Sequence, residues 1–181
     1  MSTATAVSTG TWNLDPTHTE IGFTVRHLMS KVRGKFETFE GSIVTAENLA
    51  DSSVKVSIDL SSINTGTADR DAHLRSSDFF GVDTYPTMTF TSTGVVDKGD
   101  NELVVTGDLA IKDVTKPVEL KVEFLGEGGD PWGGTRVGVE ATTTISRKEF
   151  GIDFNIPVGG DTVMIGDKIT INIVAEAVLQ A

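Results

Sequence analysis

The sequence predicts an all-β protein, folded as a closed or nearly closed antiparallel β-barrel with a short helical flap. Nine segments alternate apolar and polar residues with period two, which is typical of an antiparallel sheet with one face hidden from water. One charged stretch, residues 70–80, interrupts that alternation and predicts the flap. A chain of 181 residues suits a single domain of this kind. A barrel of this size is either filled by its own side chains or holds one small ligand.

The N-terminal half predicts three strands after a loose start. Residues 1–11 are rich in Ser, Thr, Ala and Gly and are predicted to form a flexible tail, which leaves residues 12–181 as the single domain. Residues 19–28 form the first predicted strand. Residues 35–47 change register, which predicts one strand with a bulge near Thr38. The third predicted strand covers residues 54–60. The inward rows of these strands, with a histidine at the end of the first, are Ile21, Phe23, Val25, His27, Phe36, Phe39, Val56 and Ile58.

The flap is predicted as a helix over residues 68–77. Thr67 is a plausible N-cap residue, and two aspartates in the first turn favour the helix dipole. A helix this short needs docking to persist. Phe79 and Phe80, immediately after it, are the predicted anchors that hold it against the barrel.

The alternation resumes after the flap and continues to the C-terminus. Residues 126–134 are rich in glycine and are predicted to form a long hairpin loop, and residues 150–160 form a second irregular stretch. Short connections favour antiparallel pairing between neighbours in the sequence. Arg147 falls on an inward position. The other residues of the inward rows and of the aromatic set in this half are Phe90, Leu109, Phe124, Ile145, Phe150, Ile171 and Ile173.

Composition excludes several functional classes. The net charge is −11 and no Lys/Arg cluster is apparent, so neither a nucleic-acid footprint nor an anionic membrane surface is indicated. The absence of cysteine excludes disulfides, thiolate metal sites and cysteine nucleophiles. No apolar run approaches the length of a membrane span, so we expect no membrane insertion. The N-terminal segment lacks the features of a signal peptide, so we expect a cytoplasmic protein.

The polar residues do not assemble into a predicted active site. His18 and His27 would lie on opposite faces of one regular strand, and no metal site or other cofactor is predicted. The sequence contains no Gly-x-Ser-x-Gly motif, and no serine has an identifiable base. We therefore predict that the protein is not an enzyme. His27 is either a hydrogen-bonded residue at the barrel end or a polar contact to a ligand head group.

The charged residues of the flap are predicted to be structural. Asp71 and Arg75 are spaced to pair on one helix face. An arginine on an inward row must find a carboxylate or carbonyl groups, so Arg147 needs a buried partner. We hypothesise that Asp71 or Asp78 is that partner and that the pair locks the flap onto the barrel.

Five stretches of the chain resemble the motifs of the YceI-like family. They are residues 12–28, residues 70–90 with their charged run and Pro86, residues 109–118, residues 147–151 and residues 163–167. The resemblance implies a lipocalin-like, eight-stranded barrel with helical insertions near one end. It also implies a bacterial protein that binds long apolar molecules such as polyisoprenoids, isoprenoid quinones or fatty amides. Many members are periplasmic and many are dimers, which implies a homodimer here. This chain departs from the family in having Asp113 where glycine is common.

We therefore predict that the barrel binds an elongated apolar small molecule, such as an isoprenoid or a fatty compound. Small inward residues such as Gly107 and Ala141 would leave volume that side chains do not fill. The alternatives are a lipid-modifying enzyme and a ligand-free structural or interaction barrel. The predicted ligand-binding residues are Phe23, Val25, His27, Phe36, Phe39, Val56, Ile58, Phe79, Phe90, Leu109, Phe124, Ile145, Arg147, Phe150, Ile171 and Ile173.

Overall fold

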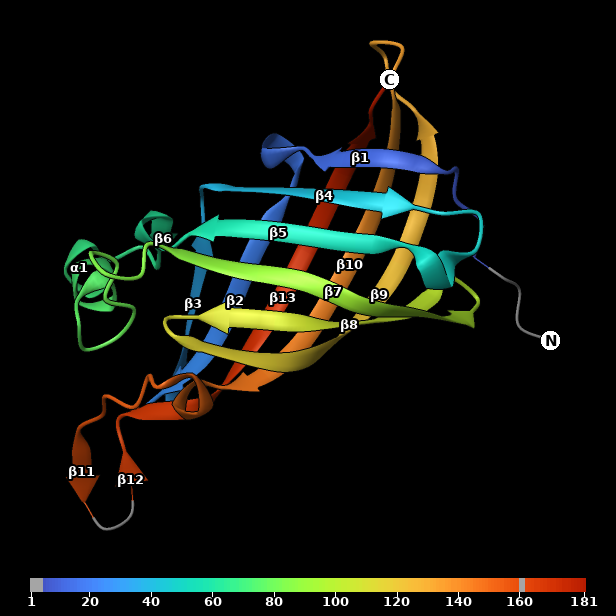
Figure 1. The fold of residues 1–181 in the computed structure, drawn as a ribbon. Coiled ribbons are helices and arrows are strands. Elements are labelled where there is room, and N and C mark those ends of the chain that lie inside the picture. The colour runs from blue at the N-terminus through green and yellow to red at the C-terminus, as the bar shows by residue number, and fades with distance from the viewer. Residues whose placement is uncertain (1–4, 160–161) are drawn as a thin grey trace.

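Eight antiparallel strands close into a barrel in the computed structural model, which describes residues 5–159 and 162–181 (Figure 1). Each strand pairs with two others, and the circuit closes where the first strand pairs with the last. This closure confirms the predicted fold class. In spatial order the strands are β1 (Gly10–Leu14), β4 (Phe39–Thr45), β5 (Ser53–Asp59), β7 (Thr87–Gly99), β8 (Glu102–Ile111), β9 (Val114–Gly129), β10 (Thr135–Ser146) and β13 (Ile165–Leu179).

Two further strands extend the barrel wall toward the flap. β2 (Glu20–His27) follows β1 after the short helix η1 (Pro16–His18), and both strands pair with β13. β3 (Ser30–Phe36) pairs with β2 and, at its end, with β6 (Ile63–Asn64). The predicted strand over residues 35–47 is wrong, because β3 ends and β4 begins on either side of a corner at residues 37 and 38. The chain changes partners there: the Glu37 amide donates to the Ser62 carbonyl, outside the β2–β3 ladder.

The flap contains a helix shorter than the sequence predicted. α1 covers Ala68–Arg75 and ends where the Ser76 amide donates to the His73 carbonyl. Thr67 occupies the N-cap position but its side chain makes no capping bond. The buried Asp71 carboxylate instead accepts a hydrogen bond from the Thr65 amide at 2.9 Å, which ties the helix to the segment before it.

Two phenylalanines and the segment after β10 complete the flap end. Phe79 is buried in the main core and Phe80 packs against that core, as expected for anchors of the flap. After β10 the chain forms the helix η4 (Arg147–Phe150) and then a small hairpin of β11 (Pro157–Gly159) and β12 (Thr162–Val163), which projects from the barrel (Figure 1). The remaining short helices are η2 (Leu49–Asp51) and η3 (Leu60–Ser62).

The glycine-rich stretch is divided between strand and loop. β9 continues to Gly129 and β10 begins at Thr135, so the predicted loop over residues 126–134 shrinks to five residues. The Asp130 carboxylate closes this turn by accepting hydrogen bonds from the amides of Trp132 and Gly134. These bonds satisfy the backbone of a tight turn, which is why the strands extend so far.

The N-terminal segment lies across the barrel end opposite the flap. The Thr5 amide donates to Asp97 at 2.9 Å, near the end of β7, whereas the flap packs near its start. The Ser8 amide donates to Glu127 at 2.7 Å. Hydrogen bonds from the Gly99 and Thr5 amides lower the pKa of Asp97. The predicted tail therefore starts strand β1 at Gly10 and makes fixed contacts from residue 5 onward, while residues 1–4 lie outside the described residues.

No helix within residues 5–159 and 162–181 is both long enough and apolar enough to cross a membrane.

Candidate ligand-binding site

The barrel encloses an apolar inner chamber of about 210 Å³. Its walls come from the inward rows of the barrel strands, and its far end is formed by Thr5 and Val7 of the N-terminal segment. Among the described residues, no charged side chain lines it. A cavity with such walls offers water few partners and accepts apolar guests.

An outer chamber of about 400 Å³ lies between the barrel mouth and the flap. Leu74, Phe79 and Phe80 form its flap side, and Ile152 and Phe154 of the segment after η4 form another wall. This chamber is also largely apolar, but it differs from the inner one in containing charged and imidazole groups. Those groups are His27, Asp69, Arg70, His73 and Arg147.

The two chambers meet at a narrow point lined by residues common to both: Phe23, Phe36, Met88 and Ile171. The rings of Phe23 and Phe36 lie 5.7 Å apart, centre to centre. The Phe23 ring packs directly on the backbone of Gly34, where any larger residue would collide with it. Aromatic and aliphatic side chains therefore form the boundary between the two chambers.

Most of the polar groups in the outer chamber are already engaged by the protein. Arg70 donates from Nε to the Thr65 hydroxyl and from Nη2 to the Thr65 carbonyl, both at 2.7 Å. His73 Nε2 lies 2.9 Å from Asp78 Oδ2, and its ring packs against Phe79 and Phe154.

The ring of His27 makes no hydrogen bond within the described part of the chain, although it lines the outer chamber. Among the described residues, the interpretation of His27 as a hydrogen-bonded side chain at the barrel end is therefore wrong. A contact between His27 and a ligand head group stays a prediction.

Arg147 is buried, with 4% of its surface exposed, and its guanidinium is bound by backbone carbonyl groups. The hypothesis that Asp71 or Asp78 is its partner is wrong, because those aspartates are bonded to Thr65 and His73 respectively. Burial lowers the pKa of Arg147, an effect that the nearby charges of Asp167 and Asp153 oppose. Its four acceptors are the carbonyl oxygens of Ile152, Phe154, Ile165 and Gly166.

The bonds of Arg147 hold the segment after η4 rather than the flap. That segment forms part of the outer chamber wall, so the hydrogen bonds of Arg147 hold Ile152 and Phe154 in that wall. The predicted Asp71–Arg75 ion pair is likewise absent among the described residues, since Asp71 turns toward Thr65.

Fourteen of the sixteen predicted ligand-binding residues line one chamber or the other. The exceptions are Phe39 and Phe150, which line neither chamber and belong to the packed core, with 8% and 1% of their surfaces exposed. Phe150 lies on η4, where strand parity does not apply. Phe39 is the first residue of β4 and has the inward parity, since it pairs with Ile58, but its side chain packs into the core at the barrel end. Whether the fourteen contact a ligand stays a prediction.

Sequence reasoning missed the parts of the wall that irregular segments supply. Ile152 and Phe154 lie in a stretch that the sequence identified only as irregular, and Thr5 and Val7 lie in the predicted tail. The alternating apolar residues Ile152 and Phe154 were the available signal. Thr5 and Val7 carried none, because two isolated residues in a polar segment form no pattern.

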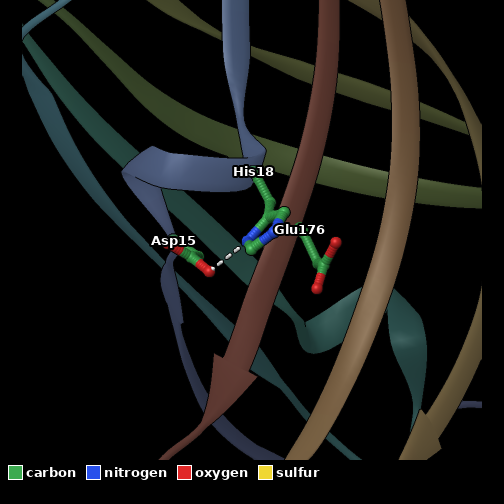
Figure 2. Close-up of side chains that lie close together, drawn as sticks. All are labelled: Asp15, His18 and Glu176. Atoms are coloured by element: carbon green, nitrogen blue, oxygen red, sulfur yellow. Dashed lines mark hydrogen bonds and ion pairs between the residues drawn. The ribbon is translucent and has the colours of Figure 1, made fainter. Parts of the chain in front are cut away.

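Asp15, His18 and Glu176 come together outside the barrel, with potential metal-ligating atoms within 4.8 Å of one another (Figure 2). Arg136 already pairs with both carboxylates, since its Nη1 lies 2.6 Å from Asp15 Oδ2 and 3.0 Å from Glu176 Oε1. Arg136 also pairs with Asp130 through Nε. A metal ion would have to displace this guanidinium, so the cluster acts as an ion-pair network joining η1, β10 and β13.

This network predicts a loss of stability in acid. Hydrogen bonds from His18 and Arg136 lower the pKa of Asp15 to about 2, against about 3.9 in an unfolded chain. The stabilisation is therefore fully present above pH 4 to 5 and is lost as the pH falls toward 2. Asp15→Asn is expected to lower the free energy of unfolding by about 1–2 kcal/mol at pH 7, because solvent screens part of the pairing.

Urea denaturation of the wild type and of Asp15→Asn at pH 7 and near pH 2 measures this effect. The gap between the two proteins should narrow in acid. The exposed Asp83 provides the control, and Asp83→Asn should follow the wild type at both pH values. An undiminished gap in acid would show that Asp15 acts through packing rather than through its charge.

Comparison with known proteins gives consistent matches over nearly the whole chain. A family model described as YceI-like domain matches residues 12–177. A UPF0312 protein of Vibrio parahaemolyticus is 46% identical over 147 residues, covering 80% of this chain and 76% of that protein. A crystal structure of the Campylobacter jejuni YCEI protein is 31% identical, with a TM-score of 0.73, covering 93% of this chain and 97% of that one.

A more distant structure shares the fold alone. It is described as a polyisoprenoid binding domain from Saccharophagus degradans implicated in plant cell wall breakdown, and it is 18% identical. Its TM-score is 0.70, and the match covers 96% of this chain and all of that one.

Proposed function

Because this chain belongs to the YceI-like family, we propose that its barrel binds an elongated apolar small molecule for transport, storage or sequestration. The candidate ligands are a polyisoprenoid, an isoprenoid quinone, and a fatty amide or acid. The observation that carries the proposal is the inner chamber, which has apolar walls and no charged side chain among the described residues. The Saccharophagus degradans domain of the same fold carries the name of a polyisoprenoid-binding domain, so that class is tested first.

The energetics favour a long ligand without strong selection among chain types. Each buried methylene contributes about 0.8 kcal/mol, so affinity grows with the length of chain inside the barrel. Apolar walls discriminate weakly between chains that differ by a methyl group. Selectivity therefore comes from the polar groups of the outer chamber, where the head group would meet His27.

Entry of the ligand requires a part of the barrel end to move. The flap is the candidate gate, because α1 has only eight residues and presents Leu74 to the outer chamber. Its one buried polar anchor, Asp71, binds the adjacent Thr65 rather than the barrel. Short, locally tethered elements are the ones that open with little cost in free energy.

The arrangement of the chambers favours binding over catalysis. Catalysis needs a nucleophile or an acid–base pair that is free to act on the ligand. Arg70 and Arg147 are occupied by backbone carbonyl groups, and His73 is occupied by Asp78. Within the described chamber walls, His27 is the unengaged imidazole, and its ring makes no hydrogen bond or ion pair with Asp69, the carboxylate that lines the same chamber.

Mass spectrometry of natively purified protein tests the proposed function. We expect a mass increment on the intact protein that disappears on organic extraction, together with a released polyprenyl or fatty compound of matching mass. If the protein emerges without cargo, it is titrated with a polyprenol and a ubiquinone. Failure to bind either compound would favour a barrel that serves as a structural or interaction protein.

A further inference from the structure

The flap end of the barrel exposes apolar side chains that no described residue covers. Met29 is fully exposed, and 42–49% of the surface of Leu28, Ile156 and Val158 is exposed. Backbone hydrogen bonds bring these segments together, from the Leu28 amide to the Met164 carbonyl and from the Met164 amide to the Ile156 carbonyl. We call Leu28, Met29, Ile156 and Val158 the apolar tip. Leu28 and Met29 form the turn between β2 and β3, Ile156 immediately precedes β11, and Val158 lies on β11 of the projecting hairpin (Figure 1).

The apolar tip borders the mouth of the outer chamber. Met164, to which both tip segments are bonded, lines that chamber, and so does His27, the residue before Leu28. The apolar tip therefore adjoins the outer chamber through Met164 and His27.

Basic side chains cover the outer face of the β2–β3 hairpin beside the tip. Arg26 and Lys31 face each other across the two strands, and Arg33 and Lys35 follow along β3, all of them exposed. We call these four residues the basic stripe. The sequence has no acidic residue between positions 21 and 36, although it has 26 in total and a net charge of −11. The stripe is therefore a positively charged region on a molecule whose net charge is negative.

Protection of a sheet edge explains part of this arrangement. Over Ser30–Gly34, β3 has no strand partner besides β2, and lysine on an edge strand discourages aggregation. That role accounts for charge but not for a fully exposed methionine and three exposed aliphatic side chains at the same end. The combination of an apolar tip and a basic flank is typical of surfaces that rest on anionic membranes.

We propose that the flap end docks on an anionic lipid bilayer, with the apolar tip in the interfacial region and the basic stripe against the head groups. The proposal rests on the proposed function for its purpose, because a long apolar ligand resides in membranes and needs a direct path into the chamber. A second copy of the chain is a poorer occupant. Two-fold pairing of the tips would bring two basic stripes together, and like charges would repel.

No acidic residue occurs among residues 21–36, which form most of β2 and all of β3. The exposed aspartates nearest the outer chamber, Asp69, Asp78 and Asp153, lie on α1, after it, and after η4. Docking through the β2–β3 hairpin would place the stripe, rather than these carboxylates, against the bilayer. Salt screens such contacts, so binding should weaken as the salt concentration rises.

Vesicle flotation tests the proposal with the full-length protein. We expect binding to vesicles made from equal parts of phosphatidylcholine and phosphatidylglycerol, and at least about tenfold weaker binding to pure phosphatidylcholine. Met29→Ser/Val158→Ser and Lys31→Glu/Arg33→Glu should each reduce binding to the anionic vesicles by a similar factor. The matched controls replace two exposed apolar or two exposed basic residues elsewhere, as Val44→Ser/Val96→Ser and Lys55→Glu/Lys121→Glu, and should bind like the wild type.

Three outcomes would overturn the proposal. The wild type could fail to float with anionic vesicles, or the control variants could lose binding to the same degree. Sedimentation could instead reveal a dimer that dissociates in the Met29→Ser/Val158→Ser variant, which would assign the tip to self-association.

Native mass spectrometry of each variant separates this test from the proposed function. Vesicle binding without bound cargo would contradict the proposed function and leave the docking proposal intact. Bound cargo without vesicle binding would contradict the docking proposal and leave the proposed function intact.

Discussion

Replacing Arg147 with methionine is expected to lower the free energy of unfolding by about 3 kcal/mol and to loosen the segment from Ile152 to Gly166. Arg147 is 4% exposed, and its guanidinium donates hydrogen bonds to four backbone carbonyl oxygens at 2.9–3.3 Å. Methionine can fill much of the volume but cannot donate to any of them. The carbonyl groups would then lose these hydrogen bonds in a place that water reaches poorly, although the Ile165 carbonyl would keep the bond from Asn155 Nδ2.

The effect of Arg147→Met should be local as well as global. The segment it holds forms a wall of the outer chamber, so its backbone amides should exchange hydrogen faster, and retention of ligand should fall. Urea denaturation and hydrogen exchange measure these two effects. Arg147→Lys should fall between methionine and the wild type, because an ammonium group donates but lacks the planar fork.

Lys148 provides the matched control for this experiment. It is the next residue along the chain and its side chain is exposed, so Lys148→Met removes the same kind of charge without disturbing the carbonyl cluster. We expect Lys148→Met to unfold close to the wild type. Equal stability of Arg147→Met and Lys148→Met would show that the buried hydrogen bonds contribute little to stability.

Arg147 also shows which part of the site can be predicted from the sequence and which part cannot. Its inward parity, counted along the strand that the structure ends at Ser146, correctly required a buried polar partner, since strand alternation fixes which side chains face the barrel interior. The partner could not be predicted, because it consists of carbonyl groups from irregular segments. Backbone acceptors have no side-chain pattern, so only the fold reveals which of them converge.

The same reasoning explains which barrel features were predictable. Phe23, Phe90 and Ile173 line the chamber as predicted, because each belongs to a strand with clear period-two alternation. Strand β3 was missed because Gly34 interrupts an apolar row that already contained little besides Val32. The basic stripe escaped notice for a related reason: Arg26 becomes a neighbour of Lys31 only when β2 and β3 pair.

Filling the inner chamber is expected to abolish ligand binding while leaving the barrel folded. Ala141 lies on the inward row of β10, opposite Val122 of β9 and Ile173 of β13, and it lines the chamber. The ring of Ala141→Phe would occupy space that the ligand chain needs. We expect at least about a tenfold loss of affinity, equivalent to burying two fewer methylene groups or more.

Stability separates a filled chamber from a damaged one. A ring that enters empty space raises the free energy of unfolding or leaves it unchanged, whereas overpacking of a solid core costs about 1–3 kcal/mol. Ala141→Phe therefore also reports whether the chamber is truly free. Thr144→Phe places the same ring on the exposed face of β10 and should retain ligand. If Ala141→Phe folds normally and keeps its cargo, the ligand does not occupy the inner chamber. If it is strongly destabilised, the inner barrel behaves as packed core, and the alternative of a ligand-free structural barrel gains support.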